Sequence, residues 1–308
     1  MRVIATGFNT GDVEGSVASL AARLDHLAQI GCTGAEITAT GLDAVIACRL
    51  IAPQVAAVRA AMARHDLAYS LHAPIAINLM DRVHADLHRR AALVSLDLAA
   101  EIGARVVVLH PGRCHPRDWL GGRETLLAQE RDELARLAEH AASLGVAVAY
   151  ENISPNARVI AGEETSYSLD PGLLADQIAA VGHPALIACL DISHARQGAT
   201  LWGFDMLAAC ARLAPHVGHL HYSDSTGIPA TVATRSQAEM QFFGQGDMHA
   251  PPGMGAVDFD GVAAALAPQI RPGTRIVIEI KRNFRAHAEA ATLAAARAFA
   301  ARLNEETA

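Results

Sequence analysis

Two hydrophobic patterns alternate along this chain, and together they predict its elements. Short continuous apolar runs are typical of strands buried on both faces of a parallel sheet. Longer stretches with apolar residues every three or four positions, such as Val17, Leu20, Leu24 and Leu27, are typical of amphipathic helices. The runs predict eight strands, at residues 3–6, 34–38, 68–72, 105–110, 146–151, 185–191, 217–221 and 274–279.

Helices are predicted between these strands, at residues 16–29, 43–65, 81–102, 124–144, 173–181, 204–213, 259–266 and 286–304. Pro53 is expected to kink or split the second helix, because proline removes a helix hydrogen bond. Residues 222–256 show no periodicity and contain much glycine and proline. A segment of this length is usually a functional lid or disordered.

Eight strand–helix units without a break in composition predict one domain, a (β/α)8 TIM barrel spanning residues 1–308. An open doubly wound sheet is the alternative, but no glycine-rich dinucleotide fingerprint follows the first strand. In a (β/α)8 barrel the catalytic groups come from the carboxyl ends of several strands, so those ends are where we expect a site.

The third to the eighth strands all end on side chains that bind metals. These residues are His72, His110, Glu151, Asp191, His221 and Glu279. A lone strand-end histidine is more often a hydrogen-bonding residue, and a lone carboxylate often pairs with arginine. Three buried carboxylates need cations or imidazoles as partners, because an unpaired buried ion costs several kcal/mol. The six together favour a bound metal, and mixed nitrogen and oxygen ligands suit Zn, Mn, Fe or Co.

Three further candidates lie just beyond the strand ends. His194 comes three residues after Asp191, and Asp247 and His249 lie in the long segment without periodicity. Each alone is an ordinary loop residue. Their proximity to the strand ends predicts that they contact metal or substrate.

The composition restricts the partners and the compartment. A net charge of −7 and an aromatic content of 4% disfavour nucleic acid, which proteins bind with basic and stacking side chains. Five cysteines without a C-x-x-C pair indicate a reducing compartment. The first residues enter a strand rather than a signal-peptide core, and no apolar run approaches the ~20 residues that span a bilayer. We therefore expect a cytoplasmic protein without membrane contact.

Several short motifs, in this order along the chain, carry a resemblance to a known family. They are Leu71-His72-Ala73-Pro74 with Ile77-Asn78-Leu79, His110-Pro111-Gly112, Glu151-Asn152, Asp191-Ile192-Ser193-His194, His221-Tyr222-Ser223-Asp224-Ser225, Asp247-Met248-His249 with Gly253-Met254-Gly255, and Ile278-Glu279. The sequence resembles the xylose isomerase-like barrel superfamily, which contains sugar isomerases, sugar epimerases, inosose-processing enzymes and endonuclease IV.

Resemblance to the epimerase branch implies one catalytic cation held by Glu151, Asp191, His221 and Glu279. Glu151 and Glu279 would then remove and return a proton on opposite faces of a small sugar, polyol or sugar phosphate. The remaining histidines of the site would hold substrate hydroxyls or a phosphate in that branch. They are His72, His110 and His194.

Resemblance to endonuclease IV instead makes all nine residues ligands of a three-metal cluster that hydrolyses a phosphoester. A sugar-type lyase or dehydratase is a further alternative. A barrel that only binds a partner around a structural metal is disfavoured, because structural zinc sites are closed and four-coordinate. The N-terminal third does not match the DNA-facing segments of that nuclease. The prediction is therefore a metal-dependent sugar isomerase or epimerase with one to three ions.

Substrate contacts are predicted from residues around the same barrel mouth. They are Glu36, Asn78, His219, Arg113, Trp119 and Trp202. Glu36 resembles the glutamate found on the second strand in the sugar-isomerase branch, and His219 also fits a position just behind the metal ligands. Three apolar residues of the long segment, Met240, Phe242 and Phe243, either cover the site or pack on a second copy, so a homo-oligomer is one expectation.

Overall fold

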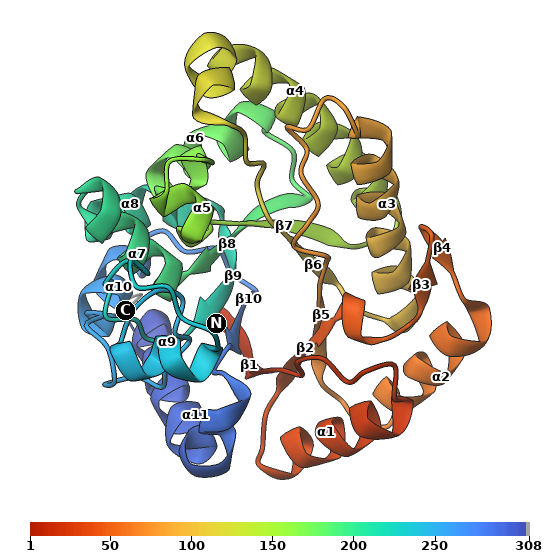
Figure 1. The fold of residues 1–308 in the computed structure, drawn as a ribbon. Coiled ribbons are helices and arrows are strands. Elements are labelled where there is room, and N and C mark those ends of the chain that lie inside the picture. The colour runs from red at the N-terminus through yellow and green to blue at the C-terminus, as the bar shows by residue number, and fades with distance from the viewer. Residues whose placement is uncertain (306–308) are drawn as a thin grey trace.

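The eight apolar runs form one closed barrel of parallel strands, in a computed structural model that describes residues 1–305. Around the barrel the strands are β1 (Val3–Asn9), β2 (Gly34–Thr38), β5 (Ala68–His72), β6 (Val106–Leu109), β7 (Ala147–Glu151), β8 (Leu186–Asp191), β9 (Val217–Tyr222) and β10 (Thr274–Ile278). β10 pairs with β1 and closes the ring, which is seen with the helices outside it in Figure 1. The predicted barrel is confirmed.

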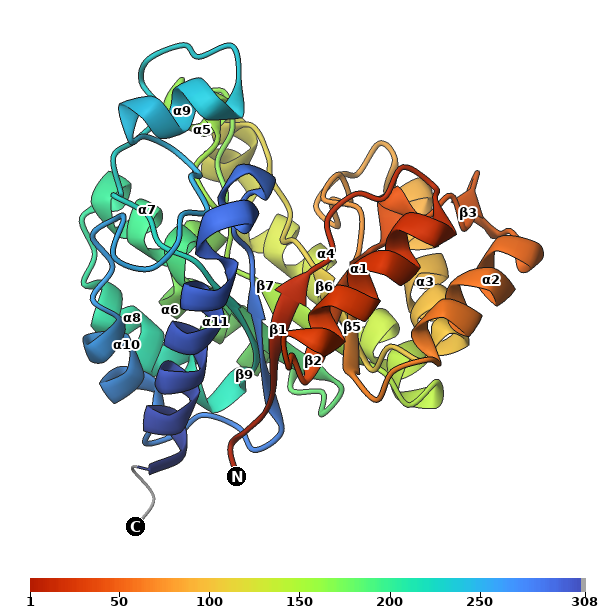
Figure 2. The ribbon, with the colours of Figure 1, turned by 90° about the horizontal axis from the view of Figure 1, so that it is seen from below.

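The longer helices cover the outside of the barrel. They are α1 (Val17–Gln29), α2 (Ala52–Met62), α3 (Ala85–Ile102), α4 (Pro116–Ser143), α6 (Pro171–Val181), α8 (Met206–Leu213), α10 (Phe259–Leu266) and α11 (Arg282–Glu305). The connections after β7, β8 and β9 hold α5 (Ala157–Ile160), α7 (Ile192–Trp202) and α9 (Gln237–Phe243). Three 3₁₀ turns complete the elements, at Ala39–Gly41, Tyr167–Leu169 and Ala214–His216. In the side view, α5 and α9 lie at the end of the barrel opposite to both termini (Figure 2).

One predicted helix is wrong in its first half. Residues 43–51 form a short antiparallel hairpin of β3 (Val45–Ile46) and β4 (Arg49–Leu50), and α2 begins only at Ala52. Ala47 and Cys48 at the hairpin turn have φ values of 51° and 57°, which a helix cannot contain. Pro53 lies in the first turn of α2, where its missing N–H costs nothing, so it starts the helix rather than kinking it.

At the carboxyl end of the barrel α4 begins earlier than predicted, and α5, α7 and α9 lie in connections for which no helix was predicted. α4 begins at Pro116, eight residues before the predicted start at 124, with the His115 ring accepting a hydrogen bond from the Arg117 amide at 3.1 Å. The chain breaks helical geometry at Gly122 inside it. α7 was not predicted, because its buried face carries the polar residues Ser193, His194 and Gln197 rather than an apolar stripe.

Strand alternation explains why the polar residues gather at one mouth. Successive side chains of a strand point to opposite faces, so every second residue enters the barrel. A separate small apolar cluster joins neighbouring strands at such positions, with Val106, Val108, Ala149, Ile187 and Cys189. The next residue in the same alternation is polar on each of these strands. These residues are His110, Glu151 and Asp191.

A buried glutamate on α4 fixes the connection after β6. Glu130 is completely buried, and its Oε1 accepts hydrogen bonds from the Gly112 amide at 2.8 Å and the Tyr150 hydroxyl at 2.6 Å. Its Oε2 accepts from the Tyr167 hydroxyl at 2.7 Å and the Gln177 amide at 2.9 Å. The network holds the residues adjoining His110 and Glu151, so it positions two of the strand ends. Within residues 1–305 no helix has the length and apolarity needed to cross a membrane.

We expect Glu130→Ala to lower the free energy of unfolding by at least ~3 kcal/mol, because each of the four buried donors left without an acceptor costs ~1–3 kcal/mol. Urea denaturation measures the change. The control is Glu124→Ala on the same helix, since the Glu124 side chain is 81% exposed, and it should change stability by less than ~0.5 kcal/mol. Equal effects of the two substitutions would contradict the role given to Glu130.

Candidate metal centre

Glu151, at the end of β7, lies at the middle of the ring of strand ends and is 1% exposed. Its Oε2 is 3.1 Å from His110 Nε2 and 3.5 Å from His72 Nε2. Its Oε1 is 3.0 Å from His221 Nδ1 and 3.5 Å from His194 Nδ1. One carboxylate therefore contacts imidazoles from β5, β9 and α7 and from the residue after β6.

Asp191 ends β8 and also begins α7. Its Oδ1 accepts the His194 amide at 2.8 Å, which caps the helix and directs the His194 ring into the site. Its Oδ2 lies 3.7 Å from His194 Nε2 and 3.9 Å from His221 Nδ1. Both distances exceed a hydrogen bond, and this buried oxygen has no hydrogen-bond partner in the described part of the chain.

The long segment after β9 adds two more candidate ligands to the ring, Asp247 and His249. His249 Nε2 is 2.8 Å from Asp247 Oδ2, and Asp247 Oδ1 is 3.4 Å from His194 Nε2. Asp224 anchors this part of the segment, because its buried carboxylate accepts the Gly253 amide at 2.8 Å and the Gly255 amide at 2.9 Å. The segment at residues 222–256, which shows no hydrophobic periodicity, is thus held to the barrel by local hydrogen bonds.

Glu279 follows β10 and completes the ring. Its Oε2 is 3.4 Å from His221 Nδ1 and 3.7 Å from His249 Nδ1. His249 Nδ1 also donates a hydrogen bond to the Glu279 carbonyl oxygen at 2.7 Å. The Asn9 amide donates to Glu279 Oε1 at 3.1 Å, which orients the carboxylate toward the ring.

A second layer of polar residues lies beneath His221. The completely buried Glu36 carboxylate is 3.2 Å from His221 Nε2 and 2.9 Å from His219 Nε2. It also accepts from the Ser70 hydroxyl at 2.9 Å and the Asn9 amide at 3.0 Å. A carboxylate on one ring nitrogen fixes which face the other nitrogen presents. Glu36 therefore lies on the Nε2 side of His221, while Nδ1 faces Glu151 and Glu279.

The crowding shifts the pKa values of the group. Burial opposes ionisation of Glu151, but the charges of His221 and His110 outweigh it and hold the pKa of Glu151 well below its usual range. Burial likewise lowers the pKa of His72 and His194, yet neighbouring carboxylates raise these pKa values to about 9 and about 10. Burial dominates at Asp191 and raises its pKa. Without a metal, protons on His72, His194 and His221, whose pKa values are raised, compensate the carboxylates.

The donor set fits a divalent transition metal. Overlapping triplets offer ligand atoms that all lie within 4.8 Å of one another, and three of them are His72–His110–Glu151, Glu151–Asp191–His221 and Asp191–His194–His249. Asp191, whose Oδ2 has no hydrogen-bond partner in the described chain, belongs to two of these triplets. Mixed imidazole and carboxylate donors suit Zn, Mn, Fe or Co.

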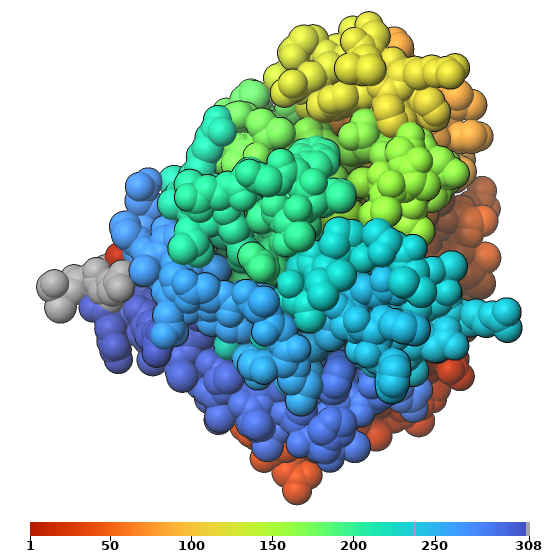
Figure 3. Space-filling model, turned by 60° about the vertical axis from the view of Figure 1, so that its left-hand side comes forward, coloured from red at the N-terminus to blue at the C-terminus, as the bar shows by residue number. Residues whose placement is uncertain are grey.

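A cavity of about 720 Å³ opens above the ring. Its floor contains His72, His110, Glu151 and other ring residues, and its walls come from residues 154–157 and from apolar residues of the long segment such as Val232 and Met240. In the space-filling view the long segment, in cyan, extends across the surface beside the green segments that precede it in the chain (Figure 3). The volume of the cavity is in the range of binding sites for small molecules.

The structure brings together all nine residues predicted as metal candidates, as the distances above describe. Of the six predicted substrate contacts, Arg113 lines the cavity. The other five lie outside its wall. Glu36 and His219 are completely buried below it, Asn78 donates to the Arg113 carbonyl at 2.8 Å, Trp119 stacks on Tyr167 with 6.3 Å between ring centroids, and Trp202 is 42% exposed at the end of α7.

Sequence reasoning missed Lys281 and Glu130. Lys281 Nζ lies 4.0 Å from Asp247 Oδ2, and the residue lines the cavity. The sequence feature that could have identified Lys281 was its position two residues after Glu279. Glu130 carries no such signal, because a glutamate within a long polar helix is normally solvated.

Comparisons with known proteins agree with this architecture. The family model for the xylose isomerase-like TIM barrel matches residues 24–302, and the chain belongs to this family. A crystal structure of a D-tagatose 3-epimerase-like protein is 20% identical, with a TM-score of 0.72 over 99% of this chain and 100% of that one. The 3-keto-D-glucoside 4-epimerase from E. coli is 15% identical, with a TM-score of 0.67 over 95% and 98%. The IolI protein with a bound zinc atom is 15% identical, with a TM-score of 0.69 over 97% and 98%. No curated protein sequence matches significantly.

We expect metal binding to release one or more protons per chain at pH 7. His72 and His194, with pKa values of about 9 and about 10, are protonated there because carboxylates lie beside them, and each is 3.5 Å from Glu151. A divalent ion bound to Glu151 would displace these compensating protons, whether or not the two rings are ligands. Affinity should therefore rise with pH up to about 9–10, as proton competition disappears. Calorimetry of zinc binding in buffers of different ionisation enthalpy measures the release.

His72→Gln should reduce this proton release, whereas His183→Gln should leave it unchanged. His183 pairs with Glu139 away from the cavity at 3.2 Å. A binding enthalpy that is independent of the buffer in the unmodified protein would refute the protonation states assigned here.

Proposed function

We propose that this chain is a divalent-metal-dependent isomerase or epimerase of a small sugar, polyol or sugar phosphate. One observation carries the proposal. Glu151 and Glu279 approach the same point, 3.0 and 3.4 Å from His221 Nδ1, although they extend from β7 and from the end of β10, which two other strands separate. Because they reach this point from strands on different sides of the barrel, they could lie on opposite faces of a substrate bound there and transfer a proton to and from its carbon.

Glu151, Asp191, His221 and Glu279 would hold the metal under this proposal. When bound, a divalent ion at such a site acts as a Lewis acid that makes the C–H bond beside a carbonyl more acidic. Glu279, whose side chain is 14% exposed, is the more accessible of the two carboxylates, and we assign it to the face that the substrate reaches first. Glu151 then serves the opposite face.

The surroundings support this division of roles. The Asn9 amide binds Glu279 Oε1 and leaves Oε2 directed at the ring. The apolar wall from the long segment limits water around a reactive intermediate, which protects a carbanion-like species from side reactions. Similarity to structures titled as sugar epimerases is consistent with this chemistry.

We expect Glu151→Gln and Glu279→Gln each to slow exchange of solvent deuterium into a ketose by roughly 10²–10⁴-fold, the usual contribution of a general acid or base. Proton NMR in D₂O with added Mn or Zn measures the exchange. Metal content is measured in parallel, so that a lost base is distinguished from a lost ligand. Glu164→Gln, in a neighbouring cavity, is the matched control and should exchange at the unmodified rate. Exchange that survives both glutamate substitutions would rule out the proposed pair.

A phosphoester hydrolase is the second candidate, and the overlap of the triplets favours it. Glu151 and Asp191 each belong to two of the three triplets named above, which would let them bridge neighbouring ions. Several ions can clamp both the attacking and the leaving oxygen of a phosphoester. The same nine residues are thus compatible with more than one ion.

Metal counting separates the two functions. The isomerase proposal predicts about one tightly held ion per chain, which His72→Ala retains because His72 lies outside the four-residue set. Elemental analysis after gel filtration gives the count. Two or three ions per chain, with His72→Ala and His249→Ala each losing one, would instead support the hydrolase, and cleavage of an abasic DNA strand or a phosphate diester would then be the assay.

A further inference from the structure

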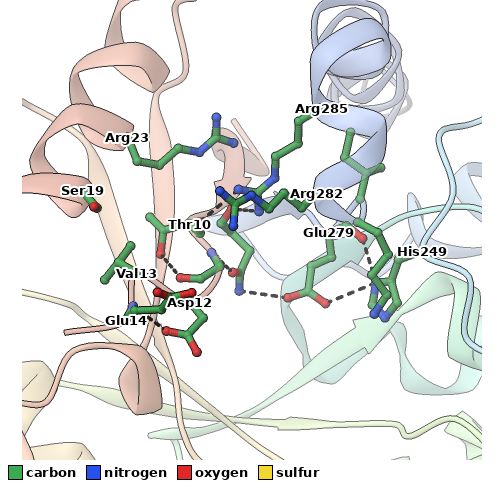
Figure 4. Close-up of a pocket in the computed structure, with 14 residues that line it drawn as sticks. Thr10, Asp12, Val13, Glu14, Ser19, Arg23, His249, Glu279, Arg282 and Arg285 are labelled. Carbon is green, nitrogen blue, oxygen red and sulfur yellow. Dashed lines mark hydrogen bonds and ion pairs between the residues drawn. The ribbon is translucent and has the colours of Figure 1, made fainter. Parts of the chain in front are cut away.

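A second chamber adjoins the metal centre. It has a volume of about 590 Å³ and lies between the connection after β1 and the start of α11. Glu279, His249 and Lys281 line both this chamber and the cavity above the ring. Figure 4 shows Arg23 extending from α1 toward Arg282 and Arg285 of α11, with Glu279 and His249 on the other side. A ligand in one space can therefore reach the other.

The chamber is lined by cationic side chains with unused donors. The Arg23 side chain is 14% exposed, and its Nε has no hydrogen-bond partner within residues 1–305. Arg285 donates to the carbonyl oxygens of Thr10 at 3.1 Å and Asn9 at 3.2 Å, while its buried Nε also has no described partner. Arg282 is exposed at the start of α11. These buried Nε atoms do not face a ligand, but a guanidinium has five N–H donors, so the terminal nitrogens of Arg285, which make two hydrogen bonds, retain further donors.

Carboxylates also lie near these cations, with Glu289 beside Arg23 and Glu279, Asp12 and Glu14 in the chamber wall. Glu289 Oε1 lies 2.6 Å from Arg23 Nη2, but its Oε2 is also 2.6 Å from His26. Asp12 and Glu14 line the chamber from exposed positions, where water screens their charge. Burial, with the charge of Arg23 next, lowers the pKa of Arg285 to about 10. The carboxylates thus match the cations in number, but Arg23, Arg282 and Arg285 gather on one side of the chamber and Glu279 lies on the other.

We propose that this chamber binds an oxyanion group of the substrate, a phosphate or a carboxylate, while the rest of the substrate lies over the metal centre. Arginine forks match the oxygen geometry of both groups. Residues 279–282 line the chamber, so it adjoins the start of the 24-residue helix α11, whose dipole also favours an anion. The substrate class is then a sugar phosphate or sugar acid. Only the identification of the remainder as a sugar rests on the proposed function.

Binding of inorganic phosphate to the metal-loaded protein tests the subsite directly. We expect saturable binding by calorimetry, weakened about 10-fold by Arg282→Gln and by Arg23→Gln, because each substitution removes a charged hydrogen-bond donor. Arg158→Gln is the matched control: this arginine lines a different cavity of about 650 Å³ but is paired with Glu163 and Glu164, and its loss should not alter binding. Arg282 is exposed, so its substitution keeps the test valid if Arg23→Gln fails to fold.

Phosphate that binds equally well to both variants, as it would on the metal alone, overturns the proposal. A wild-type protein that binds neither inorganic phosphate nor an aldonate also overturns it. A ketopentose phosphate, an aldonate and an unsubstituted ketopentose distinguish the two anion sources, since arginine-dependent binding of the first or the second identifies the group. Arginine-dependent binding of phosphate or aldonate, without exchange of solvent deuterium into any ketose, would support this subsite and refute the isomerase proposal. Exchange of ketoses, together with phosphate and aldonate binding that the arginine variants do not weaken, would instead support the isomerase and refute this subsite.

Discussion

Carboxylates and imidazoles at the mouth of this barrel lie closer together than ions can remain in an apolar interior without compensation. Glu151 has four histidine nitrogens within 3.5 Å and is 1% exposed. Asp191 adds an oxygen with no hydrogen-bond partner in the described chain. Protons on His72 and His194 can supply the missing charge, and so can a divalent ion. Protons and a metal ion would therefore compete at this site, which would link any metal-dependent activity to pH.

The rest of the fold holds this arrangement from outside. Glu36 orients His221 from below, Glu130 fixes the connections beside His110 and Glu151, and Asp224 ties down the segment that carries Asp247 and His249. Each support is a buried carboxylate that accepts several hydrogen bonds, and each comes from a different part of the chain. Without such supports the side chains of the ring would adopt other rotamers and would no longer converge on one point.

The barrel and its ring could be predicted because parallel strands buried on both faces leave continuous apolar runs, and their last residues are readily identified. The hairpin at residues 43–51 could not, since only the backbone shows that Ala47 and Cys48 have positive φ. Helix α7 was missed because three of its seven buried positions, Ser193, His194 and Gln197, are polar and interrupt the apolar pattern. The arginine chamber left no signal either, since Arg23 and Arg285 lie on helices where charged residues are normally solvated.

Asn9 connects the two chambers and explains how opposite charges can lie side by side without neutralising each other. The side-chain amide of Asn9 donates to Glu36 and Glu279 on the metal side. Its backbone carbonyl oxygen accepts a hydrogen bond from Arg285 on the other side. Arg285 is thereby held to the backbone and kept from pairing with Glu279. The carboxylates remain available to a cation and the guanidinium groups to an anion. A small molecule with a metal-binding carbonyl and hydroxyl at one end and an oxyanion at the other satisfies both sides at once.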